Sequence, residues 1–150
     1  HPSNPEYAIG AVDANGIAVF NEAEVALVDQ QWLEKEVQKQ KNEAGRRTKV
    51  YRKGKKLLKL SGKTVIIVDD GVATGFTMRL AVKAVKKENP GRIIVAVPVA
   101  PPESIGEIKN EGADEIILLE PPKEFLGAVG SHYQEFEQVE DEEVINLLNQ

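Results

Sequence analysis

The feature that most constrains the fold is a short apolar run that ends abruptly in a polar loop. Residues 64–68 read Thr-Val-Ile-Ile-Val, and residues 69–77 continue Asp-Asp-Gly-Val-Ala-Thr-Gly-Phe-Thr. A bounded run of β-branched residues is typical of a buried strand. Apolar residues then recur at helical spacing over 77–87, so we expect a helix there. The chain therefore carries a strand–loop–helix unit whose loop begins with two adjacent carboxylates.

Two further strands and one further helix follow this unit. We expect the strands at residues 93–99 and 115–119, and the helix between them at 102–110. Strands that are apolar on both faces and alternate with helices are typical of a parallel sheet covered on both sides. The sequence therefore predicts the α/β class, with a Rossmann-like parallel sheet and flanking helices.

The first part of the chain predicts an N-terminal β-hairpin. Apolar residues at 7–12 and 17–20 flank Asp13-Ala14-Asn15-Gly16, and Asn-Gly between apolar runs is a strong hairpin signal. Asn21 and Glu24 then form a capping-box pattern, which predicts a long polar helix over about 22–49. A last helix is expected from about residue 141. We interpret residues 1–150 as a single domain, since one core commonly holds roughly 100 to 200 residues.

Composition narrows the classes of function. The chain has no cysteine, which excludes disulfides and thiolate metal sites and favours a cytoplasmic setting. Its formal net charge of −5 argues against nucleic acid as a partner. No apolar run approaches the roughly 20 residues that span a membrane. We therefore expect a cytoplasmic protein with small-molecule ligands.

The loop after residue 68 has the chemistry of a ribose 5-phosphate site. In an open parallel sheet, ligands bind beyond the carboxyl ends of the strands. Small residues let the backbone approach a ligand, and free amides at the start of the next helix attract an anion, which suits a phosphate. Thr74 and Thr77 add hydroxyl donors. Asp69 and Asp70 can accept hydrogen bonds from vicinal sugar hydroxyls and can help to hold a hydrated Mg²⁺.

Two other phosphate motifs do not fit. Gly62-Lys63-Thr64 matches the end of a P-loop, but Leu57 occupies the position of the required earlier glycine, and a strand follows where a P-loop opens a helix. No Gly-x-Gly-x-x-Gly follows any expected strand, so a dinucleotide-binding fold is not supported.

Residues 65–77 resemble the binding signature for 5-phosphoribosyl-1-pyrophosphate (PRPP) in type I phosphoribosyltransferases. That signature has four apolar residues, two acidic residues and a small loop with Thr-Gly that ends in Thr or Ser. The wider chain is similar to the bacterial and archaeal branch of "predicted phosphoribosyltransferase" proteins, through residues 4–12, Arg47 with Tyr51-Arg52, and residues 128–136. The resemblance covers essentially the whole chain and implies the type I phosphoribosyltransferase fold.

The resemblance implies a role for each residue of the loop. Asp69 and Asp70 would bind the ribose hydroxyls and, through water, a Mg²⁺ that also meets the pyrophosphate. The chain is expected to join PRPP to a small nitrogenous base, or in the reverse direction to cleave a nucleotide with pyrophosphate. A homodimer is left open. The 5-phosphate would be held by loop backbone amides and threonine hydroxyls, from Gly71, Val72, Ala73, Thr74, Gly75, Phe76 and Thr77.

Two departures from the family pattern keep an alternative open. The family's pyrophosphate loop reads like Pro-Arg-Gly-Gly in this branch and lies upstream of the signature, and nothing before Tyr7 matches it. We therefore expect either an N-terminally truncated sequence or a chain that senses PRPP or nucleotide without turnover. Ala73 replaces the aspartate of the hypoxanthine-guanine enzymes, although adenine and uracil enzymes also have Ala-Thr-Gly there.

Basic residues of the stretch 46–63 are expected to contact pyrophosphate, with Arg47, Arg52 and Lys53 as candidates.

Overall fold

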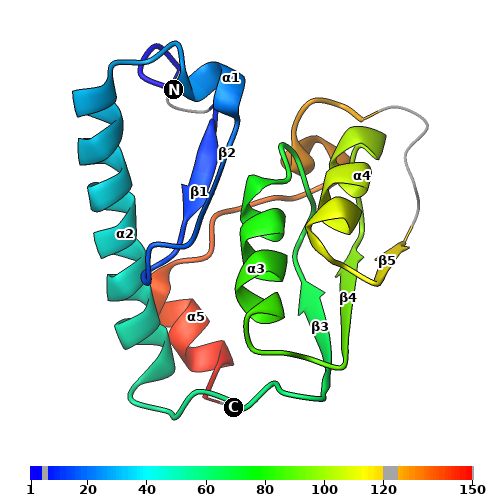
Figure 1. The fold of residues 1–150 in the computed structure, drawn as a ribbon. Coiled ribbons are helices and arrows are strands. Elements are labelled where there is room, and N and C mark those ends of the chain that lie inside the picture. Colours follow the sequence, from blue (N-terminus) through cyan, green and yellow to red (C-terminus); the bar gives the residue numbers. More distant parts are fainter. Residues whose placement is uncertain (5–6, 120–124, 150) are drawn as a thin grey trace.

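The computed structural model describes residues 1–4, 7–119 and 125–149, and the arrangement is α/β as predicted (Figure 1). The chain forms two small sheets, five α-helices and one 3-10 turn within these residues. In chain order the elements are β1 (Gly10–Val12), β2 (Ala18–Phe20), α1 (Glu22–Val25), α2 (Gln30–Arg52), β3 (Thr64–Val68), α3 (Phe76–Lys86), β4 (Arg92–Val97), α4 (Pro102–Glu111), β5 (Glu115–Leu118), η1 (Val129–His132) and α5 (Asp141–Leu147).

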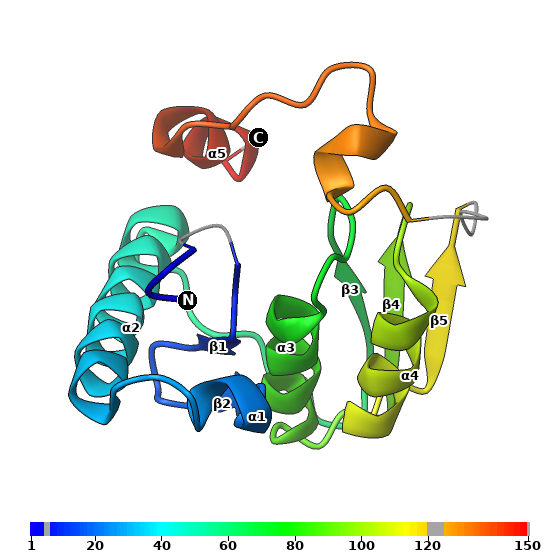
Figure 2. The same ribbon diagram turned by 90° about the horizontal axis from the view of Figure 1, so that it is seen from above.

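The larger sheet is parallel and has the strand order β3-β4-β5. Helices α3 and α4 both lie on one of its faces (Figure 2). The side chains between these helices and the sheet form the main core, in which Val82, Val95 and Ile108 are fully buried. This packing sets the carboxyl ends of the three strands along one edge of the sheet, where the loops to α3 and α4 begin.

The prediction that helices cover both faces of this sheet is wrong for the described residues. Ile67 packs into the main core, whereas Ile66 and Val68, on the other face of β3, are 60% and 72% exposed. An apolar run shows that both faces of a strand are hydrophobic, but it does not show what covers the second face. In this chain the hairpin and α2 do not cover that face, because the hairpin packs on α3 and α2 packs on the hairpin (Figure 2).

The predicted hairpin is confirmed. Strands β1 and β2 pair antiparallel, with Gly10 opposite Phe20 and Val12 opposite Ala18. Asp13 closes the turn, because its Oδ1 accepts a hydrogen bond from the Ile17 amide at 2.7 Å. The hairpin packs on α3 through a second, smaller cluster of buried side chains, which are Val19, Phe76 and Leu80.

The single helix expected over 22–49 is divided into α1 and α2. Asn21 caps α1 as predicted, since its Oδ1 accepts hydrogen bonds from the amides of Ala23 and Glu24. A second cap, Asp29, accepts from the Trp32 amide at 2.8 Å and starts α2 in a new direction. The sequence pattern missed this second cap. No helix within the described residues is long and apolar enough to cross a bilayer.

Candidate functional site

The predicted ligand loop lies at the carboxyl end of β3 and leads directly into α3 (Figure 1). It surrounds a small hollow of about 180 Å³. The signature residues that were adjacent in sequence therefore also converge in space. The lining residues are Asp69, Gly71, Val72, Ala73, Thr74, Gly75, Thr77, Met78 and Val129.

The loop presents hydrogen-bond donors to this hollow. Gly75 precedes α3 with a φ of 80°, a left-handed conformation that favours glycine, and no side chain caps the helix. Within the described residues, the backbone amides of residues 73–77 donate no hydrogen bond. Thr74 and Thr77 are both exposed. Free amides at a helix start, together with two hydroxyls, suit a phosphate group.

Of the acidic pair, Asp69 borders the same hollow, whereas Asp70 is not among the described residues that line it. The Asp69 Oδ1 accepts a hydrogen bond from the Asp70 amide at 3.0 Å. Partial desolvation raises the pKa of Asp69; the Asp70 amide opposes this shift, and the negative charge of Asp70 adds to it. Among the described residues, no lysine or arginine acts on the pKa of Asp69, which leaves this carboxylate available to hydroxyl donors or a hydrated cation.

The neighbouring connection, from β4 to α4, supports the back of the ligand loop. The Val72 amide donates to the Val99 carbonyl at 2.9 Å. The hydroxyl of Ser104, which is only 5% exposed, donates to the Ala73 carbonyl at 2.8 Å. These bonds fix the loop backbone on the side of the β4–α4 connection. They leave the amides of residues 73–77 without a hydrogen bond among the described residues.

Gly71 has no space for a side chain. A Cβ at this position would lie 2.6 Å from Cγ1 of Val129 and 2.8 Å from Cγ1 of Val99. Tyr133, a few residues after Val129, donates from its hydroxyl to the Asp70 carbonyl at 2.5 Å. Residues 129–133 thus pack against the backbone of Asp70 and Gly71, so that the loop is fixed from two sides.

Sequence reasoning missed these supporting residues. Val99, Ser104 and Val129 occupy ordinary apolar or small-residue positions in the sequence, so nothing marks them as neighbours of the loop. Tyr133 lies within the stretch 128–136 that carries part of the family resemblance, but its position in the sequence does not mark it as a neighbour of the loop. Its ring does pack on Phe136, with centroids 5.1 Å apart. The hydroxyl contact with Asp70 could not be read from spacing, because it depends on the path of the tail.

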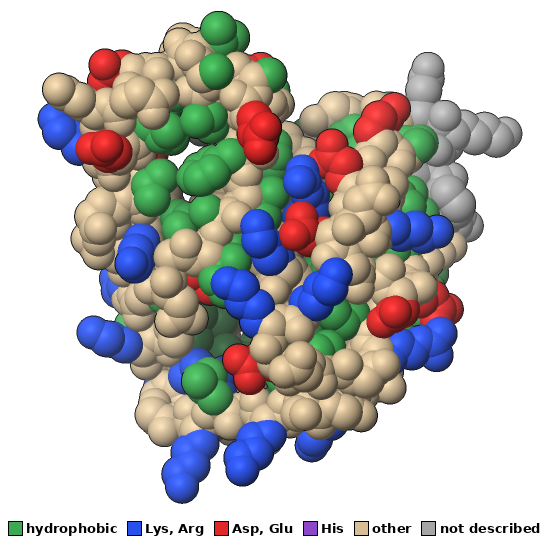
Figure 3. Space-filling model, in the orientation of Figure 1, with side chains coloured by type: hydrophobic (Ala, Val, Ile, Leu, Met, Phe, Trp, Pro, Cys, Tyr) green, Lys and Arg blue, Asp and Glu red, His purple; other side chains and the backbone are tan. Residues whose placement is uncertain are grey.

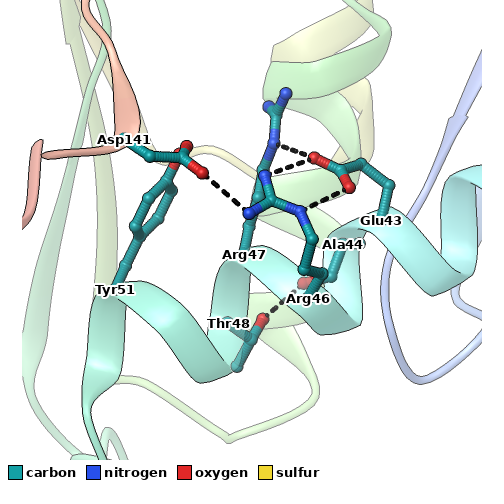
Figure 4. Close-up of polar contacts among 7 residues, drawn as sticks. All are labelled: Glu43, Ala44, Arg46, Arg47, Thr48, Tyr51 and Asp141. Carbon is teal, nitrogen blue, oxygen red and sulfur yellow. Dashed lines mark hydrogen bonds and ion pairs between the residues drawn. The ribbon is translucent and has the colours of Figure 1, made fainter.

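The predicted cationic residues lie apart from the acidic pair. Arg47 is on α2, where its Nε donates to Glu43 at 2.8 Å (Figure 4). Hydrogen bonds from Arg46 and Arg47 lower the pKa of Glu43 to about 2. Arg46 also pairs with Asp141 at 2.7 Å, which holds the start of α5 against α2. Arg46 and Arg47 are therefore engaged in ion pairs within α2, and Arg46 also in one between α2 and α5.

The other two candidates, Arg52 and Lys53, make their described contacts at the end of α2 and not at the ligand loop. Arg52 donates to the Lys56 carbonyl at 2.9 Å, and Lys53 closes α2 in a left-handed conformation with a φ of 44°. Among the described residues, the lining of the 180 Å³ hollow includes no lysine or arginine. A cation for a pyrophosphate must therefore come from elsewhere, and the contacts proposed for Arg47, Arg52 and Lys53 stay predictions.

A larger cavity of about 460 Å³ lies between α2, the hairpin and α3. Figure 3 shows gaps between hydrophobic side chains on this side of the molecule. Trp32, Tyr7 and Phe20 line it, together with Arg47. Thr77 borders both hollows, but neither Asp69 nor Asp70 is part of this lining. Its size alone therefore does not make it the reactive site.

The acidic pair fits one mode of metal binding better than another. Within the described part of the chain, no group of three His, Cys, Asp or Glu side chains could hold a metal ion. An all-protein cage is thus not formed. Mg²⁺ commonly keeps several waters and binds through one or two carboxylates plus substrate phosphates. Asp69 and Asp70 suit that second mode.

Comparison with known proteins agrees with the geometry of the loop. Residues 12–133 match the family model described as the phosphoribosyl transferase domain. Because this match covers most of the chain, and because the strand–loop–helix site lies within it, the protein belongs to the phosphoribosyl transferase domain family.

Known relatives and a solved structure extend this result. Two Mycobacterium tuberculosis proteins, "Putative phosphoribosyl transferase MT0597" of strain CDC 1551 and "Putative phosphoribosyl transferase Rv0571c" of strain H37Rv, are each 33% identical over 150 residues. The alignment covers 99% of this chain, which spans only 33% of the length of these curated relatives. The crystal structure of TT1426 from Thermus thermophilus is 40% identical, with a TM-score of 0.71, and the match covers 98% of this chain and 69% of that chain.

Proposed function

We propose that this protein is a Mg²⁺-dependent phosphoribosyltransferase that binds PRPP through residues 69–77 and transfers phosphoribosyl to or from a nitrogenous base. The observation that carries the proposal is the hollow at the end of β3, where a carboxylate faces free amides and two hydroxyls. Such a hollow has hydrogen-bond acceptors for sugar hydroxyls at one side and donors for a phosphate at the other. We place this activity in the cytoplasm, in line with the absence of cysteine.

The chain's own residues would act mainly by positioning. Asp69 and Asp70 would hold the ribose hydroxyls, while the amides of residues 73–77 would hold the 5-phosphate. Fixing the sugar at both ends orients its anomeric carbon. There the bond to pyrophosphate oxygen breaks, its electron pair leaves with the pyrophosphate, and a base nitrogen forms the new bond. A Mg²⁺ bound through water at Asp69 and Asp70 would neutralise charge on the pyrophosphate.

A second candidate function is PRPP or nucleotide sensing without turnover. It is favoured by the hollow's lack of a lysine or arginine lining among the described residues, because a departing pyrophosphate requires positive charge. Both candidates need the sugar-phosphate half of the site. They differ only in whether the protein supplies the pyrophosphate half.

Calorimetric titration with sugar phosphates tests the binding half. Ribose 5-phosphate and 2-deoxyribose 5-phosphate present the same phosphate, but only the first has both hydroxyls for the acidic pair. We expect the deoxy sugar to bind on the order of tenfold more weakly, as one hydrogen bond to a charged group is lost. Equal affinities would contradict the role of the carboxylates, and no binding of either sugar would contradict the phosphate site.

A pyrophosphate-release assay separates the two candidate functions. The full product of the gene is incubated with Mg²⁺, PRPP and each of a panel of nitrogenous bases. Release that depends on one base supports the transferase. Binding of PRPP with no release for any base supports sensing.

A further inference from the structure

The peptide that joins Asp70 to Gly71 has a partner for its carbonyl but none for its amide. The Asp70 carbonyl accepts a hydrogen bond from the Tyr133 hydroxyl at 2.5 Å. Gly71 is buried, and its amide donates no hydrogen bond within the described residues. Buried amides in folded proteins nearly always have an acceptor, because an unpaired one costs free energy. The Gly71 amide therefore requires an acceptor that the described chain does not supply.

The two polar groups of this peptide point in opposite directions. The described residues contain no cis peptide bond, and in a planar trans peptide the C=O and N–H groups are antiparallel. By binding the carbonyl, Tyr133 therefore also fixes the direction of the Gly71 amide, which points away from Tyr133. Gly71 lines the 180 Å³ hollow, whereas Tyr133 is not among its described lining residues. This geometry favours an amide that is directed to the ligand side of the loop.

Tyr133 is itself held by its neighbours in the chain. Its ring packs on Phe136, with the two centroids 5.1 Å apart. The Phe136 ring in turn lies against Gly130, where an added Cβ would be 2.8 Å from the nearest ring carbon. The Tyr133 amide donates to the Gly130 carbonyl at 3.2 Å. These contacts restrict the Tyr133 ring, so its hydroxyl is presented to Asp70 with little further loss of side-chain entropy.

We propose that Tyr133 is a positioning residue for the ligand loop, and that the Gly71 amide, which it orients, donates a hydrogen bond to a sugar oxygen of the ligand. This inference rests on the proposed function and deepens it, because it adds a donor at the sugar end of the hollow. The Asp69 carboxylate supplies an acceptor at the same end. A sugar hydroxyl is both a donor and an acceptor, so an amide beside a carboxylate can bind both its hydrogen and its oxygen.

Titration with two ligands separates this positioning role from a general effect on the fold. Ribose 5-phosphate would occupy both ends of the hollow, whereas inorganic phosphate would occupy only the end formed by the amides of residues 73–77. Tyr133→Phe removes the hydroxyl and keeps the ring that packs on Phe136. Tyr51→Phe is the matched control, since the Tyr51 hydroxyl also donates at 2.5 Å, but to Asp141 on α5. The affinities are measured by calorimetry on the full product of the gene.

We expect Tyr133→Phe to bind ribose 5-phosphate roughly three- to tenfold more weakly than the wild type, and inorganic phosphate with unchanged affinity, since one neutral hydrogen bond is affected. Tyr51→Phe should bind both ligands like the wild type. Unchanged affinity of Tyr133→Phe for ribose 5-phosphate, or equal weakening for both ligands, would overturn the positioning role. No binding of ribose 5-phosphate by the wild type would contradict the proposed function, and this inference with it.

The NMR signal of the Gly71 amide in the wild type gives a second readout that does not depend on any variant. Ribose 5-phosphate should move its proton resonance downfield, because the amide gains an acceptor, and inorganic phosphate should leave it nearly unchanged. A Gly71 resonance that ignores ribose 5-phosphate while the amides of residues 73–77 respond would overturn the inference and leave the phosphate site intact.

Discussion

Two strand-to-helix connections lie side by side at the carboxyl ends of the strands. One of them is polar and the other is apolar. The connection from β3 to α3 carries two carboxylates, two glycines and the exposed Thr74, and Thr77 follows in the first turn of α3. The connection from β4 to α4 reads Pro98-Val99-Ala100-Pro101, and both Val99 and Ala100 are buried. The two share a topology, so the topology does not decide which of them binds a ligand. The carboxylates and the free amides are what support the first connection as the proposed ligand site.

The second connection nevertheless contributes to the first. Val99 accepts a hydrogen bond from the Val72 amide, and Ser104 donates to the Ala73 carbonyl. The helices that follow are joined as well, because Arg79 on α3 pairs with Glu107 on α4 at 2.6 Å. The comparison therefore distinguishes the connection proposed to bind the ligand, called the binding connection below, from the supporting connection, and substitutions in each should have different consequences.

The largest effect is expected from the acidic pair. Asp69→Asn combined with Asp70→Asn removes the charged acceptors of the binding connection, and each such hydrogen bond contributes about 1.5–3 kcal/mol. The affinity for Mg²⁺-PRPP should fall roughly 100-fold or more by calorimetry, with the far-UV circular dichroism unchanged. Glu103→Gln, in the first turn of α4, is the control and should keep its affinity. An unchanged affinity in the double variant would remove the assignment.

The next effect should come from Gly71→Ala. The added Cβ would contact Val129 and Val99 at less than van der Waals distance, and such overpacking costs about 1–3 kcal/mol. Urea denaturation should show this loss, together with weaker PRPP binding. Gly106→Ala is the matched control, because it lies on α4 with open space around it and should be stabilising by about 0.5–1 kcal/mol. Similar stability changes for the two glycines would contradict the tight approach at Gly71.

A smaller effect is expected from Ser104→Ala in the supporting connection. The variant removes the donor to the Ala73 carbonyl, at a cost of about 1 kcal/mol in unfolding free energy. PRPP affinity should fall only a few-fold, since no ligand contact is lost. Ser131→Ala removes an exposed hydroxyl and should change neither quantity. If Ser104→Ala were as damaging to binding as the acidic variants, the division between binding and supporting residues would be wrong.

The smallest effect concerns the ligand-free stability of Asp69→Asn. The folded pKa of Asp69 is raised above its usual value, mainly by desolvation, so ionisation of this carboxyl destabilises the folded state as the pH rises. The cost is absent below the unfolded pKa and complete above the folded pKa. The single variant should therefore melt at the same temperature as the wild type, or a slightly higher one, at neutral pH. A scan of melting temperature toward acid pH should show any difference disappear, and a variant that is less stable at neutral pH would contradict the sign.

The position of the proposed ligand loop between a strand and a helix was predictable because its sequence signal is local. The residues from Asp69 to Thr77 are contiguous, and the strand before them and the helix after them fix how the loop is presented. The hairpin followed from Asn15-Gly16 for the same reason. The supporting contacts of Val99, Ser104 and Tyr133 link segments that are tens of residues apart, and periodicity contains no information on such pairs. The second cap at Asp29 is an intermediate case, because its signal is local but lies within a pattern that continues on both sides.

The face of the main sheet opposite α3 and α4 shows the same limit of sequence reasoning. The apolar run at 64–68 correctly predicted a strand with two hydrophobic faces. It also led to the expectation of two helical layers, which the described residues do not provide. A sequence pattern shows that the face of a strand is hydrophobic. Only the folded structure shows whether other residues cover that face.

The most direct test of the central claim is an NMR titration of the ¹⁵N-labelled protein with ribose 5-phosphate. The account predicts saturable shifts of the backbone amides of residues 72–77. The amides of residues 98–105, in the supporting connection, should shift much less. Shifts confined to the α2 and hairpin side of the larger cavity, or equal shifts in both connections, would contradict the assignment of the sugar-phosphate site to the loop after β3.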